Sequence, residues 1–283
     1  MPLPAPSPDA LNFVARVAHA YEKLIVSPHA DPESGLGGSL FYAGEMDEEG
    51  RALVVAANIA GAATLVASAD PATQKQAIRD AIADFLVTSL DEALRILKNQ
   101  LRKRETVSVC VAMAPAAMER EMNERGVRPD LLRHGVPIAP LHEALTHQEG
   151  GRDETDPTSV PALVIWRVDS ANRKDLAVLD ATALECLDAN DWPGRRWLRL
   201  APRYLGRMAK GLRLLSTHLE FAARFSMRRS WNEDDPAGPQ RRRKGSNGRD
   251  RLAKGKGPRR GAPPGGPTEV GATCPRRRSR RWR

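Results

Sequence analysis

An acidic loop bounded by two glycines is the first feature of this sequence that could do chemistry. Gly44 and Gly50 enclose the run Glu-Met-Asp-Glu-Glu, and the apolar segment Ser39–Ala43 comes directly before them. Glycines between a strand and a helix let backbone N–H groups approach a phosphate group. Here four carboxylates stand where the anion would dock, and like charges ~4 Å apart repel by several kcal/mol near a protein surface. We therefore expect a solvated acidic turn that caps the next helix, and weak nucleotide binding.

Asp70 is a candidate helix cap. It follows the apolar segment Thr64–Ala67 and stands directly before Pro71. An aspartate followed by proline is typical of a helix N-terminus, where the side chain caps the first turn.

Other catalytic and metal-binding chemistry lacks a matching motif. The six histidines contain no H-x-x-x-H pair, and His142 and His147 would point about 140° apart on a helix, which does not suit a shared metal ion. The sequence has no G-x-S-x-G and no P-loop signature. Its three cysteines are widely separated, which argues against a disulfide framework, and Cys110 is expected to be a small buried hydrophobe. We predict no catalytic residue and no metal site.

Strand-like and helix-like segments alternate between Ser39 and Leu132. This alternation predicts a parallel sheet with right-handed crossovers. The segment Val107–Met113 is a nearly continuous apolar run, as in a strand buried on both faces. Ser89 is expected to cap a helix, with Glu92 completing a capping box. The other expected strands are 39–43, 64–67 and 85–88, and the other expected helices are 8–24, 51–60, 71–83 and 115–125.

The carboxyl-terminal part predicts a strand at 162–168, a helix at 174–187 and a long helix at 203–225. Leucines and other apolar residues return at helical spacing along the last of these. The predicted fold class is α/β, a Rossmann-like parallel sheet with helices on both faces. An α-rich carboxyl-terminal segment and a disordered basic tail complete the prediction.

The positive charge of the chain is concentrated in the tail. Residues 228–283 hold 18 Lys or Arg and 5 Asp or Glu, a net charge of +13, whereas the other residues hold 26 and 30, a net charge of −4. Aliphatic residues nearly vanish there, so the tail is expected to be disordered. It could bind nucleic acid without sequence preference. The change of composition near Gln240 also fits an out-of-frame extension, and both interpretations stay open.

Composition also bounds the location and the domains. No apolar stretch reaches the ~18 residues of a membrane span, and the N-terminus lacks the pattern of a secretory signal, so we predict a cytoplasmic protein. The predicted domains are an N-terminal helix and loop (1–38), a Rossmann-type domain (39–150), a strand with helices (151–229) and the tail (230–283). Homo-oligomer formation is left open.

A series of motifs in the first half of the chain resembles the nucleotide-binding domain of urocanases. Residues 41–70 fit that family's frame of strand, glycine loop, helix and second strand, with Ala43-Gly44, Gly50, Ala60-Gly61 and Asp70 in register. Residues 84–112 resemble its D-x-x-V-x-x-L-D-E-A-L motif and next strand, and 118–132 its R-G-V-x-P-D turn. The resemblance implies NAD as cofactor, and it implies cofactor-binding positions at Gly44, Gly50, Gly61 and Asp70.

The chain departs from the urocanase pattern where that family carries its chemistry. Ser68 replaces the glutamate of the family's E-x-D, Met113-Ala114-Pro115 replaces a G-N-A turn, and residues 134–139 replace a D-Q-T-S-x-H segment. We therefore expect a divergent urocanase-like domain with a binding or regulatory role and with hydratase activity reduced or lost. Two alternatives stay open: an active urocanate hydratase that uses NAD in histidine degradation, and a protein that binds polyanions through its tail.

Overall fold

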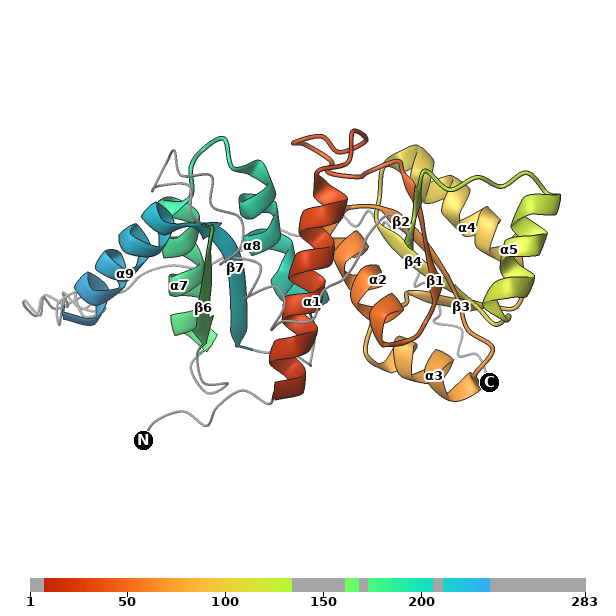
Figure 1. Ribbon diagram of the computed structural model, residues 1–283, viewed down its shortest axis with the longest axis horizontal. Helices are drawn as coiled ribbons and strands as arrows, with labels where there is room; N and C mark the ends of the chain where they lie inside the picture. Colours follow the sequence, from red (N-terminus) through yellow and green to blue (C-terminus); the bar gives the residue numbers. More distant parts are fainter. Residues whose placement is uncertain (1–7, 134–160, 168–172, 206–210, 235–283) are drawn as a thin grey trace, which may run out of the picture. The chain divides into compact units, whose positions relative to one another are not determined.

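The computed structural model describes residues 8–133, 161–167, 173–205 and 211–234, and Figure 1 shows how their helices and strands are arranged. All of these residues lie within one compact unit, Met1–Asp235. The predicted loop-rich stretch 134–160 and most of the predicted tail lie outside the described ranges. The proposed domain boundaries at 38, 150 and 229 therefore stay predictions.

A five-stranded parallel sheet forms the first half of the described chain, which confirms the predicted Rossmann-like α/β class. The strand order is β3-β4-β2-β1-β5, and all four neighbouring pairs are parallel. The strands are β1 (Leu40–Glu45), β2 (Ala63–Ala67), β3 (Phe85–Val87), β4 (Val107–Val111) and β5 (Leu131–Leu132).

Helices cover both faces of this sheet. One hydrophobic core joins the face that carries Phe41 and Val66 to helices α1 and α2. A second core joins the opposite face, which carries Tyr42 and Leu65, to helices α4 and α5. The helices are α1 (Pro8–Ile25), α2 (Glu48–Ala60), α3 (Pro71–Arg79), α4 (Leu90–Lys103) and α5 (Pro115–Glu124).

The strand predicted to be most buried is an interior strand. β4 pairs with β2 on one side and β3 on the other, and all five of its residues are buried. Cys110 lies within it, and burial raises the pKa of its thiol to about 11. Both the unbroken apolar pattern and the inert cysteine follow from helices covering the two faces of the sheet.

Local capping signals set the ends of the helices as the sequence predicts. Asp70 caps α3 by accepting hydrogen bonds from the backbone N–H groups of Ala72 and Thr73. Ser89 caps α4 by accepting from the N–H of Glu92. α3 ends at Arg79 rather than near Ala83, and the backbone of Ala81 is left-handed there, with φ 57°.

The carboxyl-terminal described segments hold three helices and a two-stranded antiparallel sheet. Strand β6 (Pro161–Arg167) pairs along its whole length with β7 (Leu212–His218), and β6 and α7 agree with the predicted strand and helix. The helices are α7 (Arg173–Cys186), α8 (Trp192–Tyr204) and α9 (Leu219–Asp234).

The predicted helix 203–225 is wrong. Apart from residues 206–210, which lie outside the described ranges, the segment holds the end of α8, the strand β7 and the start of α9. β7 contacts α1 and α8 as well as α9, so Leu212, Arg213, Leu214 and Leu215 are all buried. Two-sided burial removes the period-two alternation that reveals a strand, and the remaining leucines fit helical spacing by chance. The buried guanidinium group of Arg213 pairs with Asp180 at 3.1 Å.

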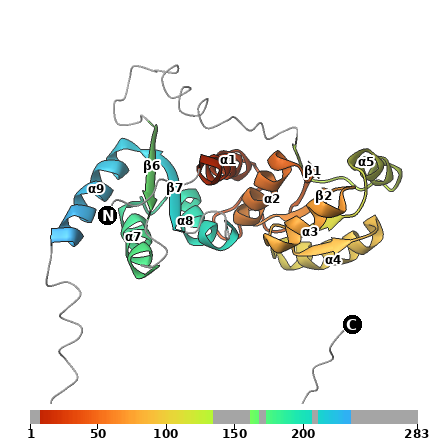
Figure 2. The same ribbon diagram turned by 90° about the horizontal axis from the view of Figure 1, so that it is seen from below.

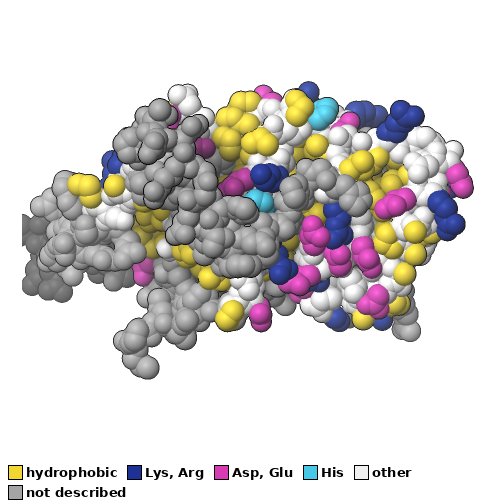
Figure 3. All heavy atoms as spheres, viewed as in Figure 1, with side chains coloured by type: hydrophobic (Ala, Val, Ile, Leu, Met, Phe, Trp, Pro, Cys, Tyr) yellow, Lys and Arg dark blue, Asp and Glu magenta, His cyan; other side chains and the backbone are white. Residues whose placement is uncertain are grey.

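Helix α1 lies along α2, as Figures 1 and 2 both show. It also contacts β7, and the hydroxyl of Tyr21 donates to the carbonyl oxygen of Pro193 on α8 at 2.7 Å. On the face drawn in Figure 3, acidic and basic side chains are interspersed over the sheet-containing half of the described chain. No helix among the described residues is long and apolar enough to cross a membrane.

Candidate functional site

The strand order creates a crevice at the carboxyl ends of β1 and β5. β1 continues through α2 to β2 on one side, whereas β5, on its other side, is reached through α5. Because α2 and α5 pack on opposite faces of the sheet, the backbone diverges at this point. Open α/β sheets bind their ligands at such switch points, outside the carboxyl ends of the strands.

A cavity of about 630 Å³ occupies this crevice. That volume is within the range of small-molecule sites. Its wall combines apolar side chains, among them Met122, Val127 and Leu132, with the charged side chains of Glu45, Glu119, Arg128 and Arg133. The hydroxyl of Tyr42 lies 3.4 Å from Oε1 of Glu119, and burial, with the nearby carboxylate, raises the pKa of Tyr42. Tyr42 is therefore a protonated hydrogen-bond donor at neutral pH.

The acidic loop beside the cavity closes the N-terminus of α2 with its own side chains. Oδ1 of Asp47 accepts from the N–H of Gly50 at 2.7 Å, which confirms the predicted capping role of this turn. The glycine at position 50 is required by the turn itself, because a Cβ there would lie 1.9 Å from the carbonyl oxygen of Glu45. The space beside Gly50 is therefore taken by the protein's own backbone and not by a ligand.

Arg133 joins the loop to the end of β5, and sequence reasoning missed it. Its Nη2 lies 2.9 Å from Oδ2 of Asp47 and 2.6 Å from Oε2 of Glu49, and its Nη1 donates to the carbonyl oxygen of Glu45 at 3.3 Å. Burial acts to lower the pKa of Arg133, but the hydrogen bonds to Asp47 and Glu49 outweigh it and raise that pKa. Its position directly after the predicted R-G-V-x-P-D turn was the one signal that could have placed Arg133 at this edge.

The four predicted cofactor-binding residues do not all come together. Gly44 lies near the end of β1 and Gly50 in the first turn of α2, both at the carboxyl edge of the sheet, and Asp70 follows β2 at the same edge. Gly61 lies at the opposite end of α2, as its left-handed C-cap with φ 102°. A Cβ at Gly61 would lie 2.5 Å from Nη2 of Arg196, so packing accounts for this glycine.

Asp70 and Ser68 both serve the turn that leads into α3. The carboxylate of Asp70 accepts from Thr73 Oγ1 and from the N–H groups of Ala72 and Thr73, and these hydrogen bonds lower its pKa. The hydroxyl of Ser68 accepts from the N–H of Asp70 at 3.3 Å. The carboxylate remains exposed, but three hydrogen bonds at the helix terminus already use most of its acceptor positions.

These arrangements do not fit a dinucleotide pyrophosphate at the N-terminus of α2. The N–H of Gly50 is occupied by Asp47, and the space beside Gly50 is filled by the carbonyl of Glu45. Glu48 adds a further exposed carboxylate, which pairs with Arg16 on α1. Four carboxylates are thus balanced by two guanidinium groups, and a pyrophosphate would add to the excess of negative charge.

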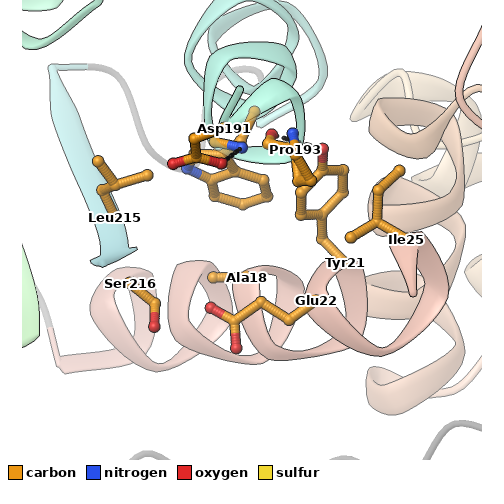
Figure 4. Close-up of a pocket in the computed structure, with 10 residues that line it drawn as sticks. Ala18, Tyr21, Glu22, Ile25, Asp191, Pro193, Leu215 and Ser216 are labelled. Atoms are coloured by element: carbon orange, nitrogen blue, oxygen red, sulfur yellow. Dashed lines mark hydrogen bonds between the residues drawn. The ribbon is translucent and has the colours of Figure 1, made fainter. Parts of the chain in front are cut away.

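A second, smaller cavity of about 110 Å³ lies between α1, α8 and β7. In Figure 4 the side chain of Tyr21 points from α1 toward Pro193, and Asp191 lies beside it. Asp191 is the N-cap of α8, accepting from the N–H of Gly194 at 2.8 Å. Tyr21 therefore holds α8 on α1, and Asp191 closes the start of α8. No cluster of His, Cys, Asp or Glu among the described residues could hold a metal ion; His142 and His147 lie outside the described ranges.

Comparisons with known proteins agree with this architecture. Residues 19–145 match the model of the Urocanase Rossmann-like domain. Among curated proteins, S-methyl thiourocanate hydratase from Variovorax sp. (strain JCM 16519 / RA8) is 25% identical over 124 residues, which are 44% of this chain and 23% of that protein. The chain thus covers about a quarter of the length of this relative. With the parallel sheet of order 3-4-2-1-5, these matches identify residues 19–145 as a urocanase-family Rossmann-like domain.

Proposed function

We propose that this chain is a binding or regulatory protein built on the urocanase Rossmann-like domain, with the family's hydratase activity reduced or lost. The observation that carries the proposal is the closed N-terminus of α2. Asp47 caps it from within, and Arg133 ties Asp47 and Glu49 together in front of it. A helix N-terminus whose cap already uses the N–H of Gly50, and whose approach is lined by carboxylates, has less to offer a phosphate.

The neighbouring strand end supports the same proposal. After β4, helix α5 begins directly with Pro115, and its N-cap residue Ala114 makes no side-chain hydrogen bond to the helix. The resemblance to urocanases would place a G-N-A turn here, with a polar asparagine side chain. An alanine and a proline cannot supply that polar group. Residues 134–139, which replace the other lost segment, lie outside the described ranges.

The cavity at the switch point is the proposed binding site. It keeps the volume and the mixed lining of a small-molecule site, although the phosphate-binding loop beside it is filled. In the proposed protein, the tyrosine–glutamate pair Tyr42–Glu119 and the guanidinium groups of Arg128 and Arg133 orient a ligand whose body contacts Met122 and Val127. The cytoplasmic location predicted from the sequence remains part of this proposal.

Release of bound cofactor gives a direct test of the proposal. The full chain, purified without added nucleotide, is denatured, and the supernatant is analysed for NAD by chromatography and mass spectrometry. Urocanate is then offered to the native protein with and without added NAD, and the loss of its ultraviolet absorbance is followed. We expect no stoichiometric NAD and no turnover. Stoichiometric NAD, or turnover that depends on the protein, would overturn the proposal.

An active hydratase that uses NAD is the second candidate, and the match to S-methyl thiourocanate hydratase favours it. Since the chain covers 23% of that relative, this candidate requires that the remaining part of the site comes from another polypeptide. The test is the same urocanate assay, repeated in a lysate of the native host and followed by co-purification. Activity that co-purifies with this chain supports the hydratase over the binding protein.

Polyanion binding through the basic tail is a separate proposal. It rests on the net charge of +13 in residues 228–283 and on the electrostatic, sequence-independent nature of such binding. The supposed partner is nucleic acid, and the affinity should fall steeply with added salt. Homo-oligomer formation also stays a prediction, which light scattering on the purified chain tests.

A further inference from the structure

A third cavity, of about 330 Å³, lies away from the crevice, between α8 and the loop that holds Glu33. Three arginines of α8 line it: Arg195, Arg196 and Arg199. Trp192 on the same helix and Glu33 on the loop also line the cavity. Residues three and four apart share one face of a helix, so the spacing of these arginines brings their guanidinium groups to one side.

Two of the three arginines are fixed by backbone carbonyl groups. Nη1 of Arg195 donates to the carbonyl oxygen of Leu184 at 3.0 Å, near the end of α7. Nε of Arg196 donates to the carbonyl oxygen of Ile59 at 3.0 Å, near the end of α2. Each guanidinium group carries five N–H donors. Anchoring through one nitrogen therefore fixes the group and leaves its other nitrogens outside these hydrogen bonds.

The three arginines lack a carboxylate partner among the described residues. No Asp or Glu in those ranges lies within 4.0 Å of a guanidinium nitrogen of Arg195, Arg196 or Arg199. Burial lowers the pKa of Arg196, and the opposing effects of Tyr21, Tyr204 and Asp31 are smaller. A partly desolvated cation without a counter-ion is stabilised by an anion that enters beside it.

We propose that the Arg195–Arg196–Arg199 cavity binds a phosphate group, either free or carried by a small aromatic molecule. Guanidinium groups present paired N–H donors that match phosphate oxygens, and this geometry favours phosphate over a simple halide. The volume is near the lower end for small-molecule sites, so the cavity suits a phosphate with one ring rather than a polymer. Trp192 offers the ring a surface to stack on, and Glu33 opposes additional negative charge.

Arginine-directed labelling tests this site in the full chain and separates it from the basic tail. The protein is treated with phenylglyoxal at constant ionic strength in chloride, in inorganic phosphate or in phenyl phosphate, and labelled residues are located by peptide mass spectrometry. We expect both phosphates to protect Arg199 relative to chloride, and Arg203, one turn further along α8, to be labelled equally in all three. Phenyl phosphate protecting at lower concentration assigns the ring to the site; equal potency assigns the phosphate alone. Equal labelling of Arg199 in chloride and in both phosphates overturns the proposal.

Three variants extend the test to affinity, measured by calorimetric titration of phenyl phosphate. Arg199→Gln removes one exposed contact and should weaken binding about three- to tenfold. The matched control Arg203→Gln removes the same charge from the same helix outside the cavity and should leave the affinity unchanged. Glu33→Gln removes the opposing carboxylate and should tighten binding about twofold. An equal loss in Arg199→Gln and Arg203→Gln would show a general charge effect and would refute the site.

Discussion

The N-terminal end of α2 is closed by carboxylates from its own loop, whereas its C-terminal end is closed by a guanidinium group 137 residues away in sequence. At the first end Asp47 accepts from the N–H of Gly50, three residues on. At the second, Arg196 donates to the carbonyl oxygen of Ile59 beside the C-cap Gly61. Negative charge at the N-terminus and positive charge at the C-terminus both suit the helix dipole.

This difference explains why one end can be interpreted from the sequence and the other cannot. In the acidic loop the capping side chain and the N–H that it accepts from are three residues apart, so the sequence spacing predicts the cap. Arg196 reaches α2 only because α8 packs on α2. No residue near Gly61 in the sequence predicts this contact. Gly61 therefore matches a cofactor-binding pattern in the sequence, whereas in the structure it allows α8 to pack against α2. Changing each end separately shows how much each closure contributes.

The largest effect is expected at the N-terminal end, from Gly50→Ala. The added Cβ would lie 1.9 Å from the carbonyl oxygen of Glu45, and this backbone atom cannot move without distorting the loop. We expect a loss of about 3 kcal/mol in the free energy of unfolding, at the upper end for overpacking, measured by urea denaturation. Gly126→Ala is the contrasting control, because its φ of 65° is left-handed but nothing lies within 4 Å of its Cβ, so it tests backbone strain without steric overlap. It should lose about 1 kcal/mol. Equal losses would show that space at Gly50 is not limiting.

Arg196→Met tests the C-terminal end, with an expected loss of about 2 kcal/mol. The methionine keeps most of the apolar stem but removes the charged hydrogen bond to Ile59. Arg199→Met, one turn along the same helix and exposed, should change the free energy of unfolding by less than about 0.5 kcal/mol. A loss in Arg196→Met as small as in Arg199→Met would mean that apolar contacts alone hold α8 on α2.

The Asp47 cap should contribute less to stability: Asp47→Ala should lower the free energy of unfolding by about 1 kcal/mol. Asp70→Ala, which removes the cap of α3, should lower it by a similar amount. The two caps differ in their partners, since Asp47 also pairs with Arg133 at 2.9 Å. A double-mutant cycle with Arg133→Met should therefore give a coupling of about 0.5 kcal/mol for Asp47 and none for Asp70. Thermal and urea unfolding measure both. Equal coupling would indicate that Arg133 acts through the loop as a whole.

The excess carboxylates beside the cap should control any residual affinity for NAD. For the unchanged chain, calorimetry should give a dissociation constant weaker than the low micromolar range. Glu48→Gln/Glu49→Gln keeps the Asp47 cap, and it should tighten binding about three- to tenfold by removing two like charges. Glu105→Gln/Glu124→Gln makes the same change in net charge at exposed positions elsewhere and should have no effect. Tight binding by the unchanged chain contradicts the proposed function.

The residues that sequence patterns predicted correctly act through near neighbours. The β4 run, the Asp70 cap and the Ser89 cap depend on residues within a few positions, and the structure confirms them. Burial on both faces hid the strand β7 within an expected helix. Arg133 was missed because its partners lie at least 84 residues away in sequence. Tertiary packing brings these groups together, and no local spacing carries that information.

Removing the tail should have the smallest effect of all on stability. Helix α9 extends to Asp234, so the matched truncation begins at Pro236 rather than after Arg229. The deleted residues contain almost no aliphatic side chains, and at about 25 cal/mol per Å² of apolar surface they can contribute little burial. The melting temperature should therefore stay essentially unchanged, while affinity for heparin or DNA, measured at increasing salt, should disappear. If the truncated chain still binds polyanions, the site lies in the remaining residues, with the arginines of α8 as the first candidates. A markedly lower melting temperature would instead show that the tail packs on the folded part.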